Sequence, residues 1–259
     1  FSKNDKQKFT AKLSVLDKNK LAKMDLKNEK ETNSALEKIR NSSFNITKIS
    51  TKRVKRNPLP PFTTSTLQQE ASNKLSFGAS RTMRIAQKLY EGINIGSETT
   101  GLITYMRTDG VQLSAQAIDE LRNEITNLHG KEYIPQTPRV YKSKAANAQE
   151  AHEAIRPTAI SRHPESVSSY LDNEQFKLYE LIWKRTISSQ MQSAELDETS
   201  ADIANKDKTI VFRANGSQVR FPGFFIYRDR NDDKILPNLV ENENVNLEKA
   251  DGEQHFTQP

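Results

Sequence analysis

The stretch NPLPPF at residues 57–62 separates two patterns in this chain. Pro58, Pro60 and Pro61 exclude a central strand or a helix interior there, because proline lacks the amide donor and its ring fixes the backbone. We therefore expect a linker or hinge at this stretch. Strand features dominate before it, and helical features dominate after it as far as about Gln190.

Strand patterns lie on both sides of the helical region. Apolar and polar residues alternate over residues 9–15, and residues 44–56 form an extended run, with a short helix expected between them at residues 32–42. Residues 209–221, TIVFRANGSQVRF, predict a hairpin whose turn is Asn215-Gly216, because this dipeptide favours tight turns between strands.

Helical spacing and capping residues characterise the region after the linker. They predict one helix from a Thr66/Gln69 capping box to Gly78, and a second that begins at Ser80 and carries Met83, Ala86 and Tyr90 on one stripe. Three further helices are predicted: from Ser114 to Gly130, over residues 147–156, and over the largely buried stretch 172–191. The first two form a helix-turn-helix, and we expect the apolar run after them to be a strand.

This order predicts an α+β fold. We expect one discontinuous β-rich hinge or arch domain, built from residues 1–63 and 191–259, and an inserted α-helical, winged-helix-like domain at residues 64–190.

The composition fits a protein that meets a polyanion. The 259 residues include 39 Lys and Arg against 33 Asp and Glu, a net charge of +6, although mere solubility would also explain that balance. Without cysteine the chain has no disulfide, thiolate nucleophile or cysteine zinc site, and it has no membrane-length apolar run or signal-peptide pattern. It begins at Phe1 rather than Met, which we interpret as a fragment.

The stretch GLITYMRTDG, residues 101–110, places a tyrosine where chemistry is conceivable. In a strand, Tyr105 and Arg107 would face the same way. A free phenol has a pKa of about 10, and a nearby guanidinium would favour its ionised form and bind a phosphate. The product would be a covalent phosphotyrosine. On spacing alone, however, an ordinary strand tyrosine remains the better interpretation.

Two other groups of residues could contact phosphate. His152 and Arg156 are four residues apart, on one face of the helix predicted there, although on this spacing alone an ordinary exposed face is the better interpretation. Arg81, Arg84 and Lys88 form a basic stripe at helical spacing, which suits phosphate contacts.

The run KRVKR at residues 52–56 is less specific than this stripe. It could contact nucleic acid, or it could keep an edge strand from pairing with another chain. Phosphate-loop, dinucleotide-binding and HExxH signatures are missing, and no carboxylate cluster predicts a metal site.

Four longer motifs, taken together, resemble the type IA DNA topoisomerases, especially bacterial DNA topoisomerase I. They are PPFTTSTLQQEAS, GLITYMRTD, QEAHEAIRPT and LYELIWKR, which occur in the order and spacing of that family. The resemblance is strong from about Pro60 to Gln190 and looser in the β-rich flanks.

The resemblance implies a mechanism. Tyr105 would attack a phosphodiester of single-stranded DNA and keep a 5′-phosphotyrosyl link, a second DNA segment would pass through the gap, and the free 3′-hydroxyl would then reseal it. Arg107 matches the arginine that stabilises the scissile phosphate, and His152 matches a histidine that positions phosphate. We also take Asp109 and Arg156, with the basic stripe, as DNA-binding residues.

The resemblance also implies what lies outside this chain. A toprim domain would supply the catalytic glutamate and lysine and bind Mg²⁺, so we expect no cofactor in this fragment. The expected partners are single-stranded and negatively supercoiled DNA and the missing toprim and gate-base domains, with no membrane. The family implies the bacterial cytoplasm, in association with the nucleoid. Alone, the fragment is expected to bind single strands without relaxing DNA.

One departure and two rivals remain. The family usually has serine where this chain has Gly110, which removes one hydroxyl from the loop. A tyrosine recombinase would have its tyrosine after its HxxR element, whereas Tyr105 precedes His152. A non-enzymatic winged-helix module, in which Tyr105 only packs, would bind DNA without forming a covalent adduct.

Overall fold

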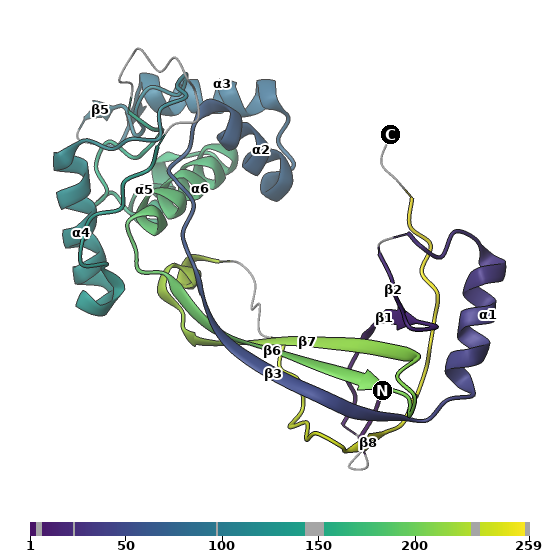
Figure 1. The fold of residues 1–259 in the computed structure, drawn as a ribbon. Helices are drawn as coiled ribbons and strands as arrows, with labels where there is room; N and C mark the ends of the chain where they lie inside the picture. The colour runs from purple at the N-terminus through teal and green to yellow at the C-terminus, as the bar shows by residue number, and fades with distance from the viewer. Residues whose placement is uncertain (4–6, 23, 97, 143–152, 229–233, 257–259) are drawn as a thin grey trace. The chain divides into compact units, whose positions relative to one another are not determined.

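The computed structural model describes the chain except for residues 4–6, 23, 97, 143–152, 229–233 and 257–259. The chain divides into two compact units, which we call the strand unit and the helical unit (Figure 1). The strand unit comprises Phe1–Lys55, Glu195–Phe221 and Arg230–Pro259, and the helical unit comprises Arg56–Ala194 and Pro222–Asp229. The functional domain boundaries expected after residues 63 and 190 stay a prediction.

The strand unit is built on a six-stranded sheet in the order β2-β1-β7-β6-β3-β8. Its strands are β1 (Lys12–Leu16), β2 (Asn19–Lys20), β3 (Phe44–Arg56), β6 (Ala194–Ala204), β7 (Ile210–Phe221) and β8 (Asn244–Val245). Helix α1 (Glu29–Arg40) begins at Asn28, whose side chain accepts the Glu31 amide. The extended run and the short helix expected before the linker are therefore confirmed.

Aromatic rings form the core of the strand unit. The Phe1 ring lies 5.1 Å from that of Phe212 and 5.5 Å from that of Phe44, both edge to face. Ile39 of α1 and Ile203 of β6 are buried in the same cluster. These rings come from segments far apart in the sequence, so this core is complete only when the N-terminal residue packs against β3 and β7.

The hairpin turn predicted at Asn215-Gly216 is wrong. Strand β7 continues through both residues, with Asn215 opposite Ser200 and Gly216 opposite Thr199 of β6. The chain turns earlier, where the Asn205 amide donates to the Ile210 carbonyl.

A close backbone approach explains the glycine instead. A Cβ atom at Gly216 would lie 2.6 Å from the carbonyl oxygen of Lys234 and 2.8 Å from Leu236 Cγ. Ser217 and Lys234 form an isolated antiparallel bridge at this point. Glycine inside a strand often marks such an approach of a second backbone.

We expect Gly216→Ala to destabilise the strand unit by about 2 kcal/mol, the usual cost of forcing one extra carbon against fixed backbone. Urea unfolding, with hydrogen exchange of the β6 and β7 amides to assign the transition, measures this. Gly78→Ala is the matched control, because a Cβ atom there has no neighbour within 4 Å. Equal stability of the two variants would contradict the close-approach explanation.

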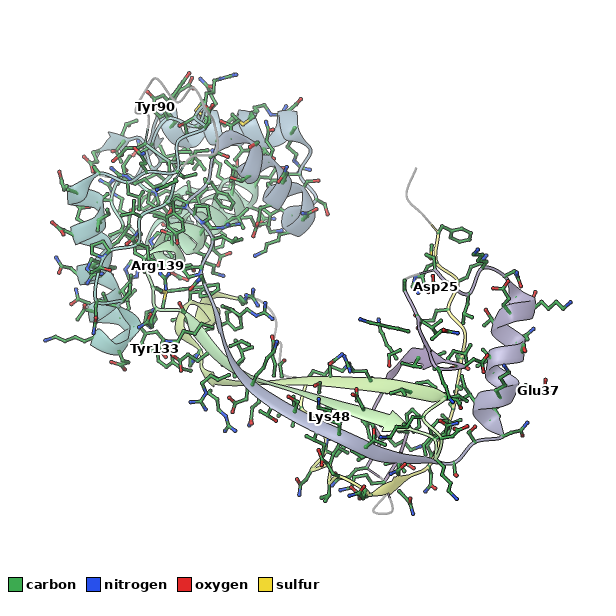
Figure 2. All side chains as sticks on the ribbon, viewed as in Figure 1. Asp25, Glu37, Lys48, Tyr90, Tyr133 and Arg139 are labelled. Atoms are coloured by element: carbon green, nitrogen blue, oxygen red, sulfur yellow. The ribbon has the colours of Figure 1, made fainter. Side chains whose placement is uncertain are left out.

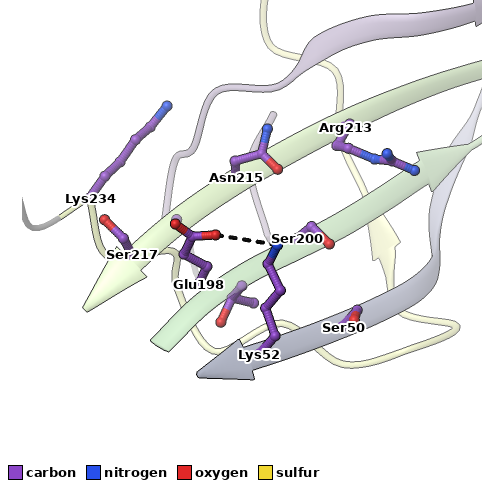
Figure 3. A pocket seen from close by; sticks show the side chains of 10 residues that line it. Ser50, Lys52, Glu198, Ser200, Arg213, Asn215, Ser217 and Lys234 are labelled. Carbon is purple, nitrogen blue, oxygen red and sulfur yellow. Dashed lines mark ion pairs between the residues drawn. The ribbon is translucent and has the colours of Figure 1, made fainter. Parts of the chain in front are cut away.

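The basic run at residues 52–56 has its counter-charges on the neighbouring strand. Lys55 lies 3.0 Å from Glu195, and Arg53 lies 3.1 Å from Asp197. Figure 3 shows the third pair, Lys52 with Glu198 at 3.6 Å. Each of these three cations therefore has a carboxylate partner on β6.

The helical unit packs around one long buried helix. Its helices are α2 (Thr64–Leu75), α3 (Ala79–Glu91), α4 (Ala115–His129), α5 (Pro164–Val167) and α6 (Asn173–Ser189), with 3₁₀ turns η1 (Lys131–Tyr133), η2 (Ser168–Tyr170) and η3 (Gly223–Tyr227) and short strands β4 (Ile93–Asn94) and β5 (Thr99–Thr100). Helix α6 contacts α2, α3, α5 and η3. Its Leu178, Ile182 and Ile187 are fully buried, which confirms the predicted buried helix.

Helix starts and faces differ in detail from the sequence predictions. Thr63 caps α2 and forms the capping box with Thr66, three residues before the predicted one. Helix α3 buries Thr82, Ile85, Ala86 and Leu89, so of the predicted stripe only Ala86 is buried, whereas Tyr90 is exposed. Ser114 caps α4 and Gly130 ends it, as predicted.

The mixed helices and antiparallel sheet confirm the α+β class. Among the helices that the structure describes, none has both the length and the apolar character required to cross a membrane.

Candidate active-site loop and basic groove

Tyr105 lies on a loop and not on the predicted strand. Within residues 101–110, all of which the structure describes, Ile103 forms one isolated bridge with Pro157, and the chain bends at Met106 and Arg107. The alternation is nevertheless real, because Met106 is buried while Tyr105 and Arg107 are exposed. Tyr105 is 43% exposed, so the residue lies at the surface of the helical unit.

A second motif segment lies alongside this loop. The Thr104 amide donates to the Arg156 carbonyl at 2.9 Å, and the Arg156 amide donates to Thr104 Oγ1 at 3.0 Å. Thr104 Oγ1 donates in turn to the Ala154 carbonyl at 2.8 Å. The loop is thus held on one side by the backbone of residues 154–156.

The helix predicted over residues 147–156 is therefore wrong where the structure describes it. Residues 153–157 are not helical, and Ile155 forms an isolated bridge with Phe62. Pro157 disfavours a helical conformation in the residue before it, which weakens the helix signal there. His152 lies outside the described residues, and Arg156 lies in a segment that is not helical.

The end of α3 packs directly on the loop. The Leu102 amide donates to the Leu89 carbonyl at 2.7 Å, and a Cβ atom at Gly101 would lie 2.4 Å from the Tyr90 carbonyl oxygen. Only glycine allows this approach. It brings the ring of Tyr90, labelled in Figure 2, to 5.4 Å from that of Tyr105, edge to face.

Two residues of the basic stripe face the same groove as Arg107. Arg84 and Lys88 of α3 line an open groove of about 620 Å³ together with Arg107 from the loop. Gln68 of α2 and Glu91 also line it. Within the described part of the chain Arg107 makes no hydrogen bond or ion pair, so its guanidinium is available to a ligand.

Arg81 is placed differently from the rest of the stripe. Its guanidinium pairs with Glu174 of α6 and lies over the ring of Phe77, 4.5 Å from the centroid. The hydrogen bond from Arg81 lowers the pKa of Glu174 below its usual value. The structure therefore does not bring Arg81 into the groove.

Arg156 is engaged by its own segment. Its guanidinium lies 2.8 Å from Glu153, donates to the Pro157 carbonyl at 2.9 Å, and has a side chain only 16% exposed. Burial alone would raise the pKa of Glu153, but hydrogen bonds from Ser114 and the charge of Arg156 outweigh it and lower that pKa. Asp109 is exposed on the loop, and its DNA-binding role stays a prediction.

No described residues offer a metal site: in that part of the chain, no group of three or more His, Cys, Asp or Glu side chains is placed to hold an ion. Thr64 and Thr104 hold the loop, and the sequence reasoning missed both, although both stand inside quoted motifs.

Comparison with known proteins gives consistent matches. A family model described as DNA topoisomerase matches residues 2–259. The chain is 50% identical over 258 residues to DNA topoisomerase 1 of Rickettsia bellii, covering 97% of this chain and 32% of that protein. It is 47% identical over 267 residues to DNA topoisomerase 1 of Xylella fastidiosa, covering 98% of this chain and 33% of that protein.

A solved structure agrees with these matches. Full-length topoisomerase I from Thermotoga maritima superposes with a TM-score of 0.72 at 35% identity, over 91% of this chain and 36% of that one. The chain thus spans about a third of the length of the proteins that it matches.

Proposed function

This chain belongs to the DNA topoisomerase family, and on that premise we propose that Tyr105 is the strand-cleaving nucleophile of a type IA enzyme. The phenolic oxygen attacks a backbone phosphorus of single-stranded DNA, and the bond from phosphorus to the 3′-oxygen breaks. A 5′-phosphotyrosyl link forms while the phenolic proton is lost and the leaving 3′-oxygen gains one. Attack by that 3′-hydroxyl reverses both bonds, so negative supercoils are relaxed without net hydrolysis.

One observation carries the proposal. An exposed tyrosine and an exposed arginine lie two residues apart on one loop, and the arginine shares a groove with Arg84 and Lys88. Three cations around one groove suit a phosphate backbone, since guanidinium and ammonium groups bind phosphate by charge-assisted hydrogen bonds. In this proposal Arg107 holds the scissile phosphate, and Arg84 and Lys88 hold its neighbours.

The remaining roles belong to the proposal as well. His152 positions phosphate, and a toprim domain elsewhere in a longer polypeptide binds Mg²⁺ and completes the site. A longer polypeptide of this kind fits the relatives, which are about three times as long as the region that matches this chain. The gate-base domains would be further parts of the same longer polypeptide. The DNA substrate would be the nucleoid DNA of a bacterial cytoplasm.

Covalent trapping tests the proposal against the binding-module alternative. The complete polypeptide is incubated with a single-stranded oligonucleotide labelled at its 3′ end and is then denatured. A 5′-phosphotyrosyl link leaves the label on the protein, and mass spectrometry should place it on Tyr105. A winged-helix binding module would release all of the label.

Arg107→Lys should lower the single-turnover cleavage rate by about 100-fold without abolishing cleavage. Lysine keeps the charge but loses the planar fork that holds two phosphate oxygens, and one such donor contributes about that factor. Arg213→Lys is the control, because its guanidinium pairs with Asp202 in the strand unit. A wild-type cleavage rate in Arg107→Lys would remove this role.

A further inference from the structure

One side chain outside the loop contacts both peptide groups that flank Arg107. Thr64 Oγ1 donates to the Met106 carbonyl at 2.7 Å and accepts the Thr108 amide at 2.9 Å. The Thr64 backbone amide adds a bond to the Thr108 carbonyl at 2.8 Å. The Met106 carbonyl belongs to the peptide group before Arg107, and the Thr108 amide belongs to the one after it.

Fixing these two peptide groups fixes the direction of the Arg107 side chain. The dihedral angles of a residue are set by the peptide planes on either side of it, and these set where its Cα–Cβ bond points. Met106 and Thr108 are 1% and 5% exposed, so both neighbours are anchored inward while Arg107 is exposed. The Thr64 hydroxyl thus helps to fix the backbone from which the exposed Arg107 side chain extends.

Helix α2 does not need this hydroxyl for its own start. Thr63 Oγ1 accepts the Thr66 amide, and Thr66 Oγ1 accepts the Thr63 amide at 2.9 Å, so a complete capping box already closes the first turn. Thr64 is the first helical residue, after the capping residue Thr63. Its hydroxyl serves the loop instead, 42 residues away along the chain.

We propose that Thr64 is a positioning residue for cleavage, which acts by aiming Arg107 at the scissile phosphate. This inference rests on the proposed function, because it assumes that Arg107 holds that phosphate. Thr64 itself does not contact DNA in the proposal. Displacement of a catalytic group by about 1 Å can lower a rate by about 100-fold. Loss of the Thr64 hydrogen bonds should therefore lower the rate of DNA cleavage.

The test compares three variants of the complete polypeptide. Thr64→Val keeps the shape but removes the hydroxyl, and we expect cleavage of bound single strands to slow by about 30-fold with DNA affinity within about twofold. Thr64→Ser restores the hydroxyl and should recover most of the rate. Thr64→Ala also removes the hydroxyl but adds no bulk, and it should show the same loss of cleavage rate. It therefore tests the inference even if Thr64→Val folds poorly.

Two further measurements separate positioning from a general loss of structure. Thr66→Val breaks the capping box of the same helix, so it should lower the melting temperature but leave the cleavage rate of folded protein unchanged. In an Arg107→Ala background, Thr64→Val should cause no additional loss, because the group that it aims is gone.

The outcomes are distinguishable. If Tyr105→Phe is inactive but Thr64→Val and Thr64→Ala cleave at the wild-type rate, the function stands and this inference is wrong. An additional loss in the Arg107→Ala background would also overturn it, since Thr64 would then act through another group. An adduct formed by Tyr105→Phe would remove the proposed function and this inference together.

Discussion

Tyr105→Phe in the complete polypeptide is expected to abolish both the covalent DNA adduct and the relaxation of supercoiled plasmid, while single-strand affinity stays within about twofold. Phenylalanine removes only the attacking oxygen, so no covalent bond to phosphorus can form. The ring remains and can keep its edge-to-face contact with Tyr90, at 5.4 Å between centroids in the wild-type chain. Labelled-oligonucleotide trapping and plasmid relaxation measure the two activities.

The neighbouring tyrosine provides the control. Tyr90 is 40% exposed, close to the 43% of Tyr105, and belongs to the same contact. Tyr90→Phe loses the hydroxyl of a similarly exposed tyrosine, and we expect it to cleave DNA at the wild-type rate. An adduct on the Tyr105→Phe protein, or complete loss in Tyr90→Phe, would show that the wrong tyrosine has been assigned.

Sequence reasoning succeeded where the structural signal is local. Helix α4 was predicted from Ser114 to Gly130 because a capping serine and a terminating glycine bracket it, and the structure has it at Ala115–His129. The buried helix α6 was predicted because its apolar residues recur on several sides. Such features depend on a dozen neighbouring residues, which the sequence displays directly.

The misses have non-local causes. Asn215-Gly216 carries a strong turn signal, yet the glycine serves a backbone approach by residues 234–236. Arg81 has the same spacing as Arg84 and Lys88, but Glu174, 93 residues away along the chain, pairs with it. Neither contact is visible in a short window of sequence.

The candidate loop illustrates both cases. Alternation predicted that Tyr105 and Arg107 would lie on one side of the chain, and the structure has both residues exposed with the buried Met106 between them. It also predicted a strand, which is wrong, because the hydrogen bonds of the loop go to Thr64 and to residues 154–156 rather than to a neighbouring strand. The motifs that carry the family resemblance include these contacting segments, which explains why they occur together.

The 259-residue chain alone is expected to bind single-stranded DNA without relaxing supercoiled plasmid. Breaking a phosphodiester requires an aligned nucleophile and also stabilisation of charge on the leaving oxygen. Tyr105 and Arg107 supply the attacking side. Over the described residues no acidic or histidine cluster is placed to hold a metal ion, and no assigned residue donates a proton to the leaving 3′-oxygen.

Binding by this chain should be electrostatic and should not require Mg²⁺. Single-strand affinity should fall steeply with salt, and each lost phosphate contact should lower the slope of log K against log salt by about 0.7. Replacing Arg84 and Lys88, which line the groove, with glutamine should therefore lower the slope by about 1.4. Lys74→Gln on α2, whose partner is Glu70, is the control and should leave the slope unchanged.

Relaxation is the decisive measurement for the isolated chain, because binding alone does not separate a topoisomerase segment from a binding module. Purified chain, negatively supercoiled plasmid and Mg²⁺ are incubated together, and the topoisomers are resolved on a gel. No change is expected at any ratio of protein to DNA. If relaxation did occur and vanished in Tyr105→Phe, a complete active site would lie within these 259 residues. The leaving-group acid would then have to come from this chain, with His152 the first residue to replace.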